Sequence, residues 1–549
     1  MAVLSFIAFT ALVAIISYYA TKNTNEKSSD GYFLGGRSLT AGVIAGSLLL
    51  TNLSTEQIVG LNGQSYSEGI LVMAWETLAA IAMVVTAIFL LPRYLKGGLT
   101  TIPQFLETRF DSGTKGLVSG LFLTGYAVIL LPTILYSGAL GISTMFDLPS
   151  ILGVDLWTSI WICVWGIGLI GSVYAIFGGL KAVAVSDTIN AIGLLVGGLL
   201  IPIFGLIAIG NGSMLEGIEV LTSQHPEKFN SIGGPDATVP FATIFTGMML
   251  VQLFYWGTNQ QIIQRALAAK NLQEGQKGLL LAAFIKILGP IIVVLPGIIA
   301  WHMFGGGLEK ADQAYPMLVN KVLPASMLGF FVAVMFGAIL SSFNSVLNSS
   351  VTLYGVDIYN QYINRDATEA EMVKQGKRFG IILAIISMVI APFLFKAQGG
   401  LFGYLQEVNG CYSIPILTII VVGYLTKRVP AIAAKIAMFL GVVLYSISQF
   451  VLKPSLASNA VMEAKTSGIE DEAILASIEV AAYPHFLHVM AILFVFNVII
   501  MLIIGRLYPR STDFVLPYTK QVDITPYKYV RQVGIAVCII VVAIYVYFA

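Results

Sequence analysis

Long apolar runs separated by short polar segments dominate the chain. Windows of about 20 apolar residues, the length that crosses a bilayer as a helix, predict fourteen spans. Their expected limits are 1–20, 39–62, 71–92, 116–145, 157–178, 184–210, 240–262, 278–302, 325–356, 377–395, 401–425, 430–452, 483–505 and 531–548. We therefore expect an all-α polytopic membrane protein with about 14 transmembrane helices, because the short alternating segments of a membrane barrel do not occur.

The second span contains a polar cluster, Thr51-Asn52-Leu53-Ser54-Thr55-Glu56-Gln57. Unsatisfied polar groups are costly in hydrocarbon, so this cluster must face protein, water or a ligand. A polar, interrupted helix at membrane depth is typical of a transport site. The cluster is therefore the first candidate functional site.

Composition agrees with a membrane protein, since 57% of the residues are hydrophobic and 11% are charged, against about 25% charged in soluble domains. The net charge of +1 predicts no nucleic-acid surface. The three cysteines lie in apolar segments, and the four histidines lie near span ends or in a loop, so no disulfide or metal site is indicated. There is no Walker A loop or other catalytic motif, and we expect a protein that is not an enzyme. The first apolar segment lacks a basic flank and a cleavage site, so we interpret it as a retained helix.

Positive charge predicts the orientation of the spans. With the N-terminus outside, 23 of the 30 Lys and Arg residues fall on the inner side, six fall outside and Lys286 lies within a span. Cytoplasmic loops retain positive residues. We therefore expect a multi-pass protein of the plasma membrane (the bacterial inner membrane) with extracytoplasmic N- and C-termini.

Two charged residues lie inside predicted spans, Glu76 in the third and Lys286 in the eighth. A charge at that depth needs a partner or a hydrated cavity. One interpretation is a fixed ion pair that holds helices together. The other is hydrogen bonding to a polyhydroxylated or zwitterionic ligand, and a ligand that bridges both residues would satisfy each interpretation.

Two further polar segments interrupt apolar spans. The ninth span contains Ser341-Ser342-Phe343-Asn344-Ser345, whose hydroxyls suit Na⁺ together with free carbonyls, although serines also pack helices closely in membranes. The seventh contains Tyr255-Trp256-Gly257-Thr258-Asn259-Gln260, which is either an interfacial aromatic belt or a site. The seventh span follows the Asn52 cluster by five spans, as expected for two five-helix repeats that each begin with an interrupted helix.

Dispersed motifs identify a family resemblance over nearly the whole chain. They are Asp30-Gly31-Tyr32-Phe33-Leu34-Gly35-Gly36-Arg37-Ser38-Leu39, Asn52-Leu53-Ser54-Thr55-Glu56-Gln57, Gly178-Gly179-Leu180-Lys181-Ala182-Val183, Ser186-Asp187, Tyr255-Trp256, Asn259-Gln260, Gln264-Arg265 and Asn348-Ser349. In these segments the chain resembles the sodium:solute symporter family, in its bacterial sodium/sugar branch related to sodium/galactose and sodium/glucose cotransporters. The resemblance implies a LeuT-like core of two inverted five-helix repeats, with extra helices at both ends.

The resemblance also implies residue roles. Sugar contacts fall on Asn52, Gln57, Glu76, Gln252, Tyr255, Lys286 and Gln406. Gating falls on Leu61, Tyr255 and Phe402, with Tyr255 stacking on the sugar. The sodium site falls on Leu50, Leu53, Ala338, Ser341 and Ser342, and the ion's exit route passes Asp187. We interpret Glu56 as a structural partner within the bundle.

The sequence departs from the family's galactose site at three positions. Gln252 stands in place of Asn, Ala79 in place of Ser, and Leu130 in place of another Asn. These changes leave the particular hexose open among mannose, glucose and galactose types. The rival interpretations are a sodium symporter for an organic anion or amino acid, and a membrane sensor without coupled transport.

The implied organisation has five parts. These are the first helix and cytoplasmic loop (1–38), the first repeat (39–210), an extracytoplasmic loop (211–239), the second repeat (240–425) and three C-terminal helices (426–549). The expected partners are Na⁺ as co-substrate, a small sugar and the bilayer. No organic cofactor, nucleic acid or obligate protein partner is expected.

Overall fold

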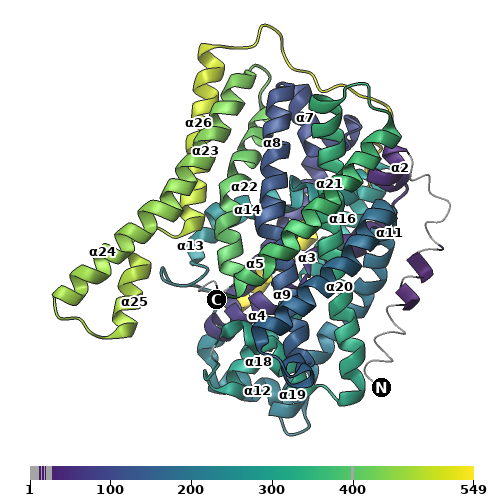
Figure 1. Cartoon of the computed structure of the whole chain (residues 1–549). Coiled ribbons are helices and arrows are strands. Elements are labelled where there is room, and N and C mark those ends of the chain that lie inside the picture. Colours follow the sequence, from purple (N-terminus) through teal and green to yellow (C-terminus); the bar gives the residue numbers. More distant parts are fainter. Residues whose placement is uncertain (1–10, 14, 18, 20–27, 309, 397–400) are drawn as a thin grey trace.

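The apolar spans fold into a helical bundle in the computed structural model, which describes residues 11–13, 15–17, 19, 28–308, 310–396 and 401–549 (Figure 1). Within these residues ten helices are long and apolar enough to cross a membrane, or twelve if each of two bent pairs is one span. The predicted span 39–62 is a further interrupted pair of shorter helices. The predicted span 1–20 lies largely outside the described residues. The prediction of an all-helical polytopic protein is confirmed.

The first half of the chain contains the helices up to and including those of the 211–239 segment. Their bounds are α2 Ser29–Leu34, α3 Ala41–Asn52, α4 Thr55–Glu68, α5 Ala74–Val85, α6 Leu91–Lys96, α7 Ile102–Arg109, α8 Ser112–Gly125, α9 Leu131–Met145, α10 Leu148–Leu152, α11 Leu156–Ile209 and α12 Met214–Gln224. The short turns are η1 Gly35–Arg37, η2 Ile70–Met73, η3 Thr86–Leu90, η4 Tyr126–Leu130 and η5 Pro226–Phe229.

The second half has the remaining helices. These are α13 Phe241–Thr243, α14 Met249–Gly257, α15 Gln260–Leu267, α16 Leu272–Lys286, α17 Gly289–Val293, α18 Leu295–Phe304, α19 Ala314–Val322, α20 Ala325–Thr352, α21 Glu369–Ile390, α22 Leu401–Leu425, α23 Ala431–Ile447, α24 Lys453–Thr466, α25 Glu472–Ala481, α26 Phe486–Leu507 and α27 Val530–Tyr547. Between them lie η6 Ile244–Met248, η7 Ala311–Gln313, η8 Leu353–Ile363, η9 Ala391–Lys396 and η10 Ser448–Leu452.

Three interruptions define the centre of the bundle. The backbone leaves the helical conformation at Leu53, between α3 and α4. Helices α14 and α15 are bent by 48° at their junction, and α16 and α17–α18 by 49°. Because each break frees backbone groups that an intact helix would pair internally, these positions can offer carbonyls and N–H groups to a ligand.

The two halves meet at the ends of their interrupted helices. The N–H of Leu39, just before α3, donates to the carbonyl of Ala268 at 3.1 Å, and the N–H of Lys270 donates back to Leu39 at 3.1 Å. This short parallel bridge ties the start of α3 to the end of α15. Segments more than 200 residues apart are therefore fixed together at one end of the bundle.

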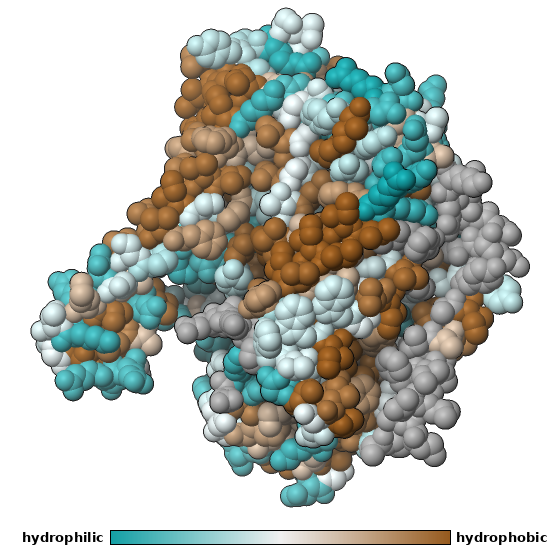
Figure 2. Space-filling view, in the orientation of Figure 1, coloured by the Kyte–Doolittle hydropathy of each residue, from teal (hydrophilic) through white to brown (hydrophobic). Residues whose placement is uncertain are grey.

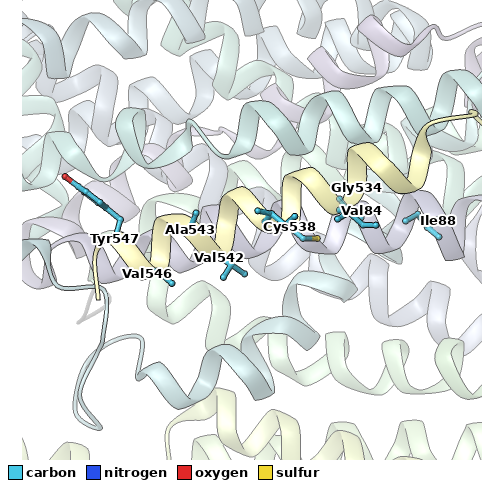
Figure 3. A pocket seen from close by; sticks show the side chains of 10 residues that line it. Val84, Ile88, Gly534, Cys538, Val542, Ala543, Val546 and Tyr547 are labelled. Carbon is cyan, nitrogen blue, oxygen red and sulfur yellow. The ribbon is translucent and has the colours of Figure 1, made fainter.

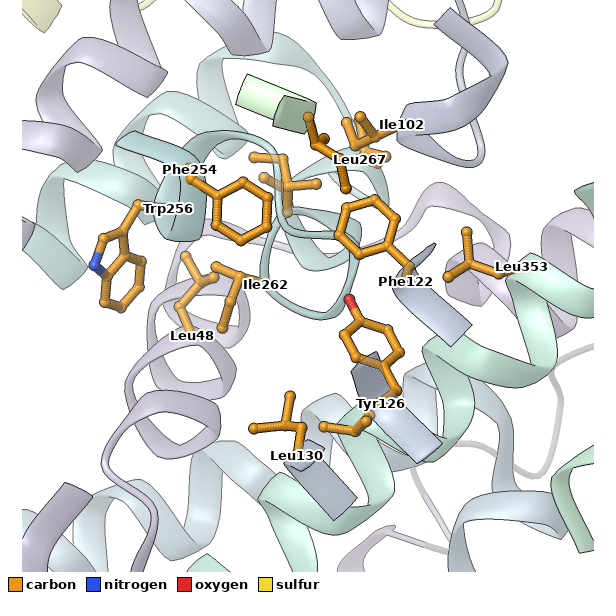
Figure 4. Packing of buried hydrophobic residues seen from close by; sticks show 14 of the residues in the cluster. Leu48, Ile102, Phe122, Tyr126, Leu130, Phe254, Trp256, Ile262, Leu267 and Leu353 are labelled. Atoms are coloured by element: carbon orange, nitrogen blue, oxygen red, sulfur yellow. The ribbon is translucent and has the colours of Figure 1, made fainter. Parts of the chain in front are cut away.

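Apolar packing surrounds this centre. Figure 4 shows Phe122 and Tyr126 facing the residues Phe254 and Ile262 across the core. All four are buried, and they join the α8–η4 segment to α14 and α15. On the outside, apolar residues form a band across the middle of the visible face, whereas polar residues gather toward the ends (Figure 2). This distribution is the one that a bilayer requires.

The two long loops that the sequence predicts to be outside the cell contain helices that hydropathy did not predict. The 211–239 segment includes α12 and η5, and the 453–482 segment forms the α24–α25 pair. In Figure 1 this pair extends sideways, away from the bundle. Both helices carry many exposed polar residues, so the search for apolar windows passed over them.

Candidate functional site

A small polar cavity lies beside the interruption between α3 and α4. Its volume is about 50 Å³, which exceeds the roughly 10–15 Å³ that a single water molecule needs. Besides α3 and α4, five other helical segments contribute to its wall: α5, η4, α14, α15 and α22. The lining residues are Asn52, Glu56, Gln57, Trp75, Leu130, Val251, Gln252, Tyr255, Asn259, Gln261, Phe402, Leu405, Gln406, Asn409 and Tyr412.

Five of the seven predicted substrate residues line this cavity: Asn52, Gln57, Gln252, Tyr255 and Gln406. They come from α3, α4, α14 and α22, which are separated by up to 350 residues of chain. The predicted gate residue Phe402 also lines the cavity. The sequence therefore identified residues that the fold brings together, although their contacts with a substrate stay a prediction.

The remaining two predicted substrate residues, Glu76 and Lys286, lie behind the wall and pair directly. The ammonium of Lys286 donates to Oε2 of Glu76, and neither side chain is more than 1% exposed. The amide of Gln57 donates to the other carboxylate oxygen at 2.5 Å. Helix α16 ends at Lys286, so the pair lies at the bend before α17. Gln57 thus connects the cavity to the ion pair.

Gln252 holds the cavity wall through both ends of its amide. Its Nε2 donates to the carbonyl of Trp75 at 2.9 Å, and its Oε1 accepts from the indole of Trp256 at 3.1 Å. The longer side chain, compared with Asn, thereby joins α14 to α5. These two partners fix the orientation of the Gln252 amide.

Aromatic side chains close one side of the cavity. The rings of Trp75 and Phe402 meet edge to face with centroids 5.2 Å apart. A Cβ at Gly60 would lie 2.6 Å from Cβ of Phe402, so glycine is what allows α4 to approach α22 here. Leu61, the other predicted outer residue, is fully buried in the same apolar cluster. These contacts fit a closure, and the gating role of each residue stays a prediction.

The predicted sodium residues lie where α20 crosses the end of α3. The hydroxyl of Ser342 donates to the carbonyl of Thr51 at 3.3 Å. Because α3 ends at Asn52, the carbonyls of Leu50 and Leu53 are at a helix terminus, where intrahelical donors are missing. Ser341 and Ala338 are buried on the same helix as Ser342. Hydroxyl and carbonyl oxygens are therefore concentrated at one junction.

Asp187, the predicted ion-exit residue, belongs to a buried network that sequence reasoning missed. Its carboxylate accepts from Ser47 at 2.7 Å and lies 3.9 Å from the guanidinium of Arg265. Arg265 also donates to Ser47 at 3.2 Å and to Ser345. Ser345 is in turn 3.1 Å from the hydroxyl of Thr51. The network connects α11 and α15 to both elements of the predicted sodium site.

Glu56, interpreted from the sequence as a structural partner within the bundle, has no ion-pair partner among the described residues. It lines the cavity. Its Oε2 is buried without a hydrogen-bond partner. The two intramembrane cations nearest the site, Lys286 and Arg265, are engaged by Glu76 and Asp187 instead.

The 211–239 segment holds the C-terminal end of α4, a second feature that sequence reasoning missed. The buried ammonium of Lys228 donates to the carbonyls of Tyr66 at 3.1 Å and Ser67 at 2.5 Å. It also lies 3.9 Å from the ring centroid of Trp301 on α18. Burial lowers the pKa of Lys228, whereas the nearby carboxylates of Glu68 and Glu227 raise it. A cation at a helix C-terminus complements the helix dipole, so the loop caps α4.

A larger groove lies elsewhere and is apolar. It measures about 920 Å³ and lies between α5 and α27, lined by Val84, Ile88, Cys538 and Val542 among others (Figure 3). Gly534 allows the close approach, since a Cβ there would lie 2.7 Å from Val84. Helix α27 buries only 17% of its apolar window. A groove of this composition on a membrane-spanning helix fits lipid chains rather than a polar solute.

Two departures from the family's galactose site have different structural settings. Leu130 ends the π-helical turn η4 and contributes an apolar patch to the cavity wall. Ala79 is buried on α5 and is not one of the residues that line the cavity. The cavity wall is therefore apolar at Leu130.

Comparison with known sequences identifies relatives along the whole chain. The model of the sodium:solute symporter family matches residues 32–441. A protein of Escherichia coli K12 described as the uncharacterized symporter YidK is 46% identical over 543 residues, which cover 99% of this chain and 90% of that protein. The sodium/glucose cotransporter of Vibrio parahaemolyticus is 33% identical over 450 residues, or 78% of this chain and 81% of that protein.

Solved structures share the fold at low sequence identity. A substrate-bound, outward-open Na⁺-coupled sialic acid symporter has a TM-score of 0.69 at 19% identity and covers 90% of this chain and 97% of its own. Mhp1, a nucleobase-cation-symport-1 family transporter, has a TM-score of 0.52 at 13% identity and covers 87% and 95%. The predicted LeuT-like fold is confirmed.

Proposed function

The chain belongs to the sodium:solute symporter family, and from this premise we propose that it carries a hexose into the cell together with Na⁺. Membership makes it a multi-pass membrane transporter that couples a small solute to sodium. The proposed substrate is a hexose of the mannose, glucose or galactose type, carried by alternating access.

One observation carries the proposal: the same interrupted helix contributes to both predicted sites. Asn52 and Gln57 line the polar cavity, and the carbonyl of Thr51, between Leu50 and Asn52, accepts a hydrogen bond from Ser342. Na⁺ held by Leu50, Leu53, Ala338, Ser341 and Ser342 would order the segment that presents Asn52 and Gln57. Ion and sugar would then stabilise the same backbone conformation.

The cavity chemistry supports a neutral polyhydroxylated substrate. A sugar hydroxyl left unpaired in a dry site costs about 1–3 kcal/mol. Gln57, Gln406 and Asn52 offer both donors and acceptors, and Tyr255 offers an aromatic ring for the pyranose. Glu76 and Lys286 would hydrogen bond the sugar from behind Gln57. Because the edge-to-face contact of Trp75 and Phe402 covers one side of the small cavity, it would open to admit a sugar.

Energy for uptake would come from the ion. Moving one Na⁺ inward through a potential of 100 mV releases about 2.3 kcal/mol, and the concentration gradient adds to this. Coupling of two ligands is reciprocal, so sugar must raise the affinity for Na⁺ as much as Na⁺ raises the affinity for sugar. Asp187 would receive Na⁺ on its way to the cytoplasm.

The principal rival is a sodium symporter for an organic anion or amino acid. That function needs a free cation for the substrate carboxylate, and Lys286 was the candidate. In the structure Lys286 is paired with Glu76, which favours the sugar. A sensor without coupled transport remains the second rival, and uphill uptake distinguishes it.

We also propose the organisation of the chain and its orientation. Residues 39–210 and 240–425 would form the two inverted repeats, with 211–239 outside between them and the three membrane-spanning segments of 426–549 following. The interrupted pairs α3–α4 and α14–α15 would begin the two repeats. Both termini would lie outside the cell.

A panel of substrates tests the proposal. Cells that express the protein are given labelled glucose, galactose, mannose, amino acids and organic acids, with and without external Na⁺. Sodium-dependent, saturable uptake of a hexose is the expected result. Uptake of a carboxylate and of no hexose would contradict the proposal.

A further inference from the structure

Glu56 is the only charged side chain among the residues that line the cavity. It is 7% exposed, and its Oε2 has no hydrogen-bond partner. An ionised carboxylate buried in this way needs a partner. Neither Lys286 nor Arg265 supplies one, because each is engaged with another carboxylate. The carboxylate of Glu56, which lacks a cationic partner among the described residues, therefore faces the space that a substrate would enter.

Two other oxygen atoms in the cavity wall also lack a hydrogen-bond donor among the described residues. Oδ1 of Asn52 and Oε1 of Gln261 are also buried without partners, and both residues line the cavity. An amide can turn over and present its NH₂ group instead, whereas an ionised carboxylate only accepts. In its ionised form, Glu56 therefore fixes this part of the wall as a hydrogen-bond acceptor.

We propose that Glu56 determines substrate specificity by accepting a hydrogen bond from a hydroxyl or ammonium group of the sugar and repelling a carboxylate. The inference rests on the proposed function and narrows its substrate class. The cavity selects neutral sugars and amino sugars and rejects sugar acids. Bound Na⁺ at the end of α3 offsets part of the charge, but it leaves the carboxylate as an acceptor toward the cavity.

A purely structural role for Glu56 makes a different prediction. Glu56 lies in the first turn of α4, where a carboxylate complements the helix dipole, and the hydroxyl of Ser54 lies beside it. Loss of that role would reduce the amount of folded protein or the uptake of every sugar by the same factor. Only a role in specificity changes the ratios between sugars of different charge.

The test compares three sugars of one configuration in the full-length protein. The substrate is whichever of glucose, galactose and mannose the wild type takes up most efficiently. Its 2-amino-2-deoxy analogue and its uronic acid are added as competitors of Na⁺-dependent uptake at pH 7. In Glu56→Gln we expect the inhibition constant of the uronic acid, relative to the hexose, to fall at least tenfold. The relative constant of the amino sugar should rise about tenfold. Glu56→Ala replaces Glu56→Gln if the latter does not reach the membrane.

Glu407→Gln is the matched control. Glu407 follows Gln406 on α22, is not one of the lining residues, and pairs with Lys453 at 2.6 Å. Its substitution removes the same charge and should leave both ratios unchanged. Ratios that also stay unchanged in Glu56→Gln, in a protein whose wild type takes up a hexose, would overturn the inference alone. A wild type that takes up no hexose would overturn the inference and the proposed function together.

Discussion

Lys286 and Glu76 form a direct ion pair inside the helix bundle, and neither side chain is more than 1% exposed. The second oxygen of the carboxylate accepts from Gln57 at 2.5 Å. A Cβ at Gly289 would lie 2.3 Å from Glu76 Oε2, so only glycine leaves room for the carboxylate there. The pair thus joins α5, α16 and the cavity residue Gln57 through hydrogen-bonded contacts.

Removing one partner of this pair should destabilise the protein strongly. Glu76→Gln or Lys286→Met leaves an uncompensated buried charge, at a cost of about 3–5 kcal/mol. The double variant Glu76→Gln/Lys286→Met leaves none and should regain most of the thermal stability of the wild type in detergent. It should still lack sugar uptake, because the proposed sugar contacts are gone. Normal uptake by the double variant would contradict a role of the pair in sugar binding.

Ser342→Ala should weaken sodium binding without unfolding the protein. The hydroxyl of Ser342 contacts the carbonyl of Thr51, at the proposed ion site. We expect the Na⁺ concentration for half-maximal uptake to rise about tenfold, equivalent to about 1.4 kcal/mol. Ser350→Ala is the control, since Ser350 bonds only within its own helix, to Val346 at 2.8 Å. Unchanged sodium dependence in Ser342→Ala would mean that the ion binds elsewhere.

Lys228→Met should loosen the outer end of α4. The ammonium caps the carbonyls of Tyr66 and Ser67, and such a cation contributes up to about 2 kcal/mol at a helix C-terminus. With a cysteine at Leu61, we expect labelling by an impermeant maleimide to become about threefold to thirtyfold faster. Lys465→Met, at an exposed position of α24, should not change the rate. Equal labelling of both variants would show that the loop does not hold the closed state.

The orientation can be checked with a tag at the C-terminus. The excess of Lys and Arg on the proposed inner side predicts that the tag lies outside. It should be cleaved by a protease added to intact spheroplasts, whereas a tag in the 97–101 loop should be protected. The opposite pattern would reverse the proposed topology.

Hydropathy was sufficient to predict the spans and the interruption of the second one, because a run of polar residues at membrane depth has few structural explanations. The same reasoning could not find the contact between Arg265 and Asp187. Each lies in its own segment, 78 positions apart in the sequence, and only the packing of both α11 and α15 against α3 and α20 brings them together. No local pattern distinguishes such a pair from two unrelated charges.

Glu56 illustrates a second limit of sequence reasoning. A buried carboxylate was expected to have a partner within the bundle, and cations were available nearby. The fold assigns Lys286 to Glu76 and Arg265 to Asp187, so Glu56 lines the cavity without a cationic partner among the described residues. Lys228 was similarly placed in a loop by its sequence, although its side chain is buried against α4. Which cation pairs with which carboxylate or carbonyl group depends on the tertiary structure.

Uphill uptake in proteoliposomes tests the central claim most directly. Purified protein is reconstituted, and labelled glucose, galactose and mannose are supplied with an inward Na⁺ gradient or with K⁺ in its place. The account predicts that one hexose accumulates above its external concentration only with the Na⁺ gradient, and that collapse of the gradient releases it. Accumulation that does not depend on Na⁺, or no transport of any hexose by protein that is correctly folded, would contradict the account.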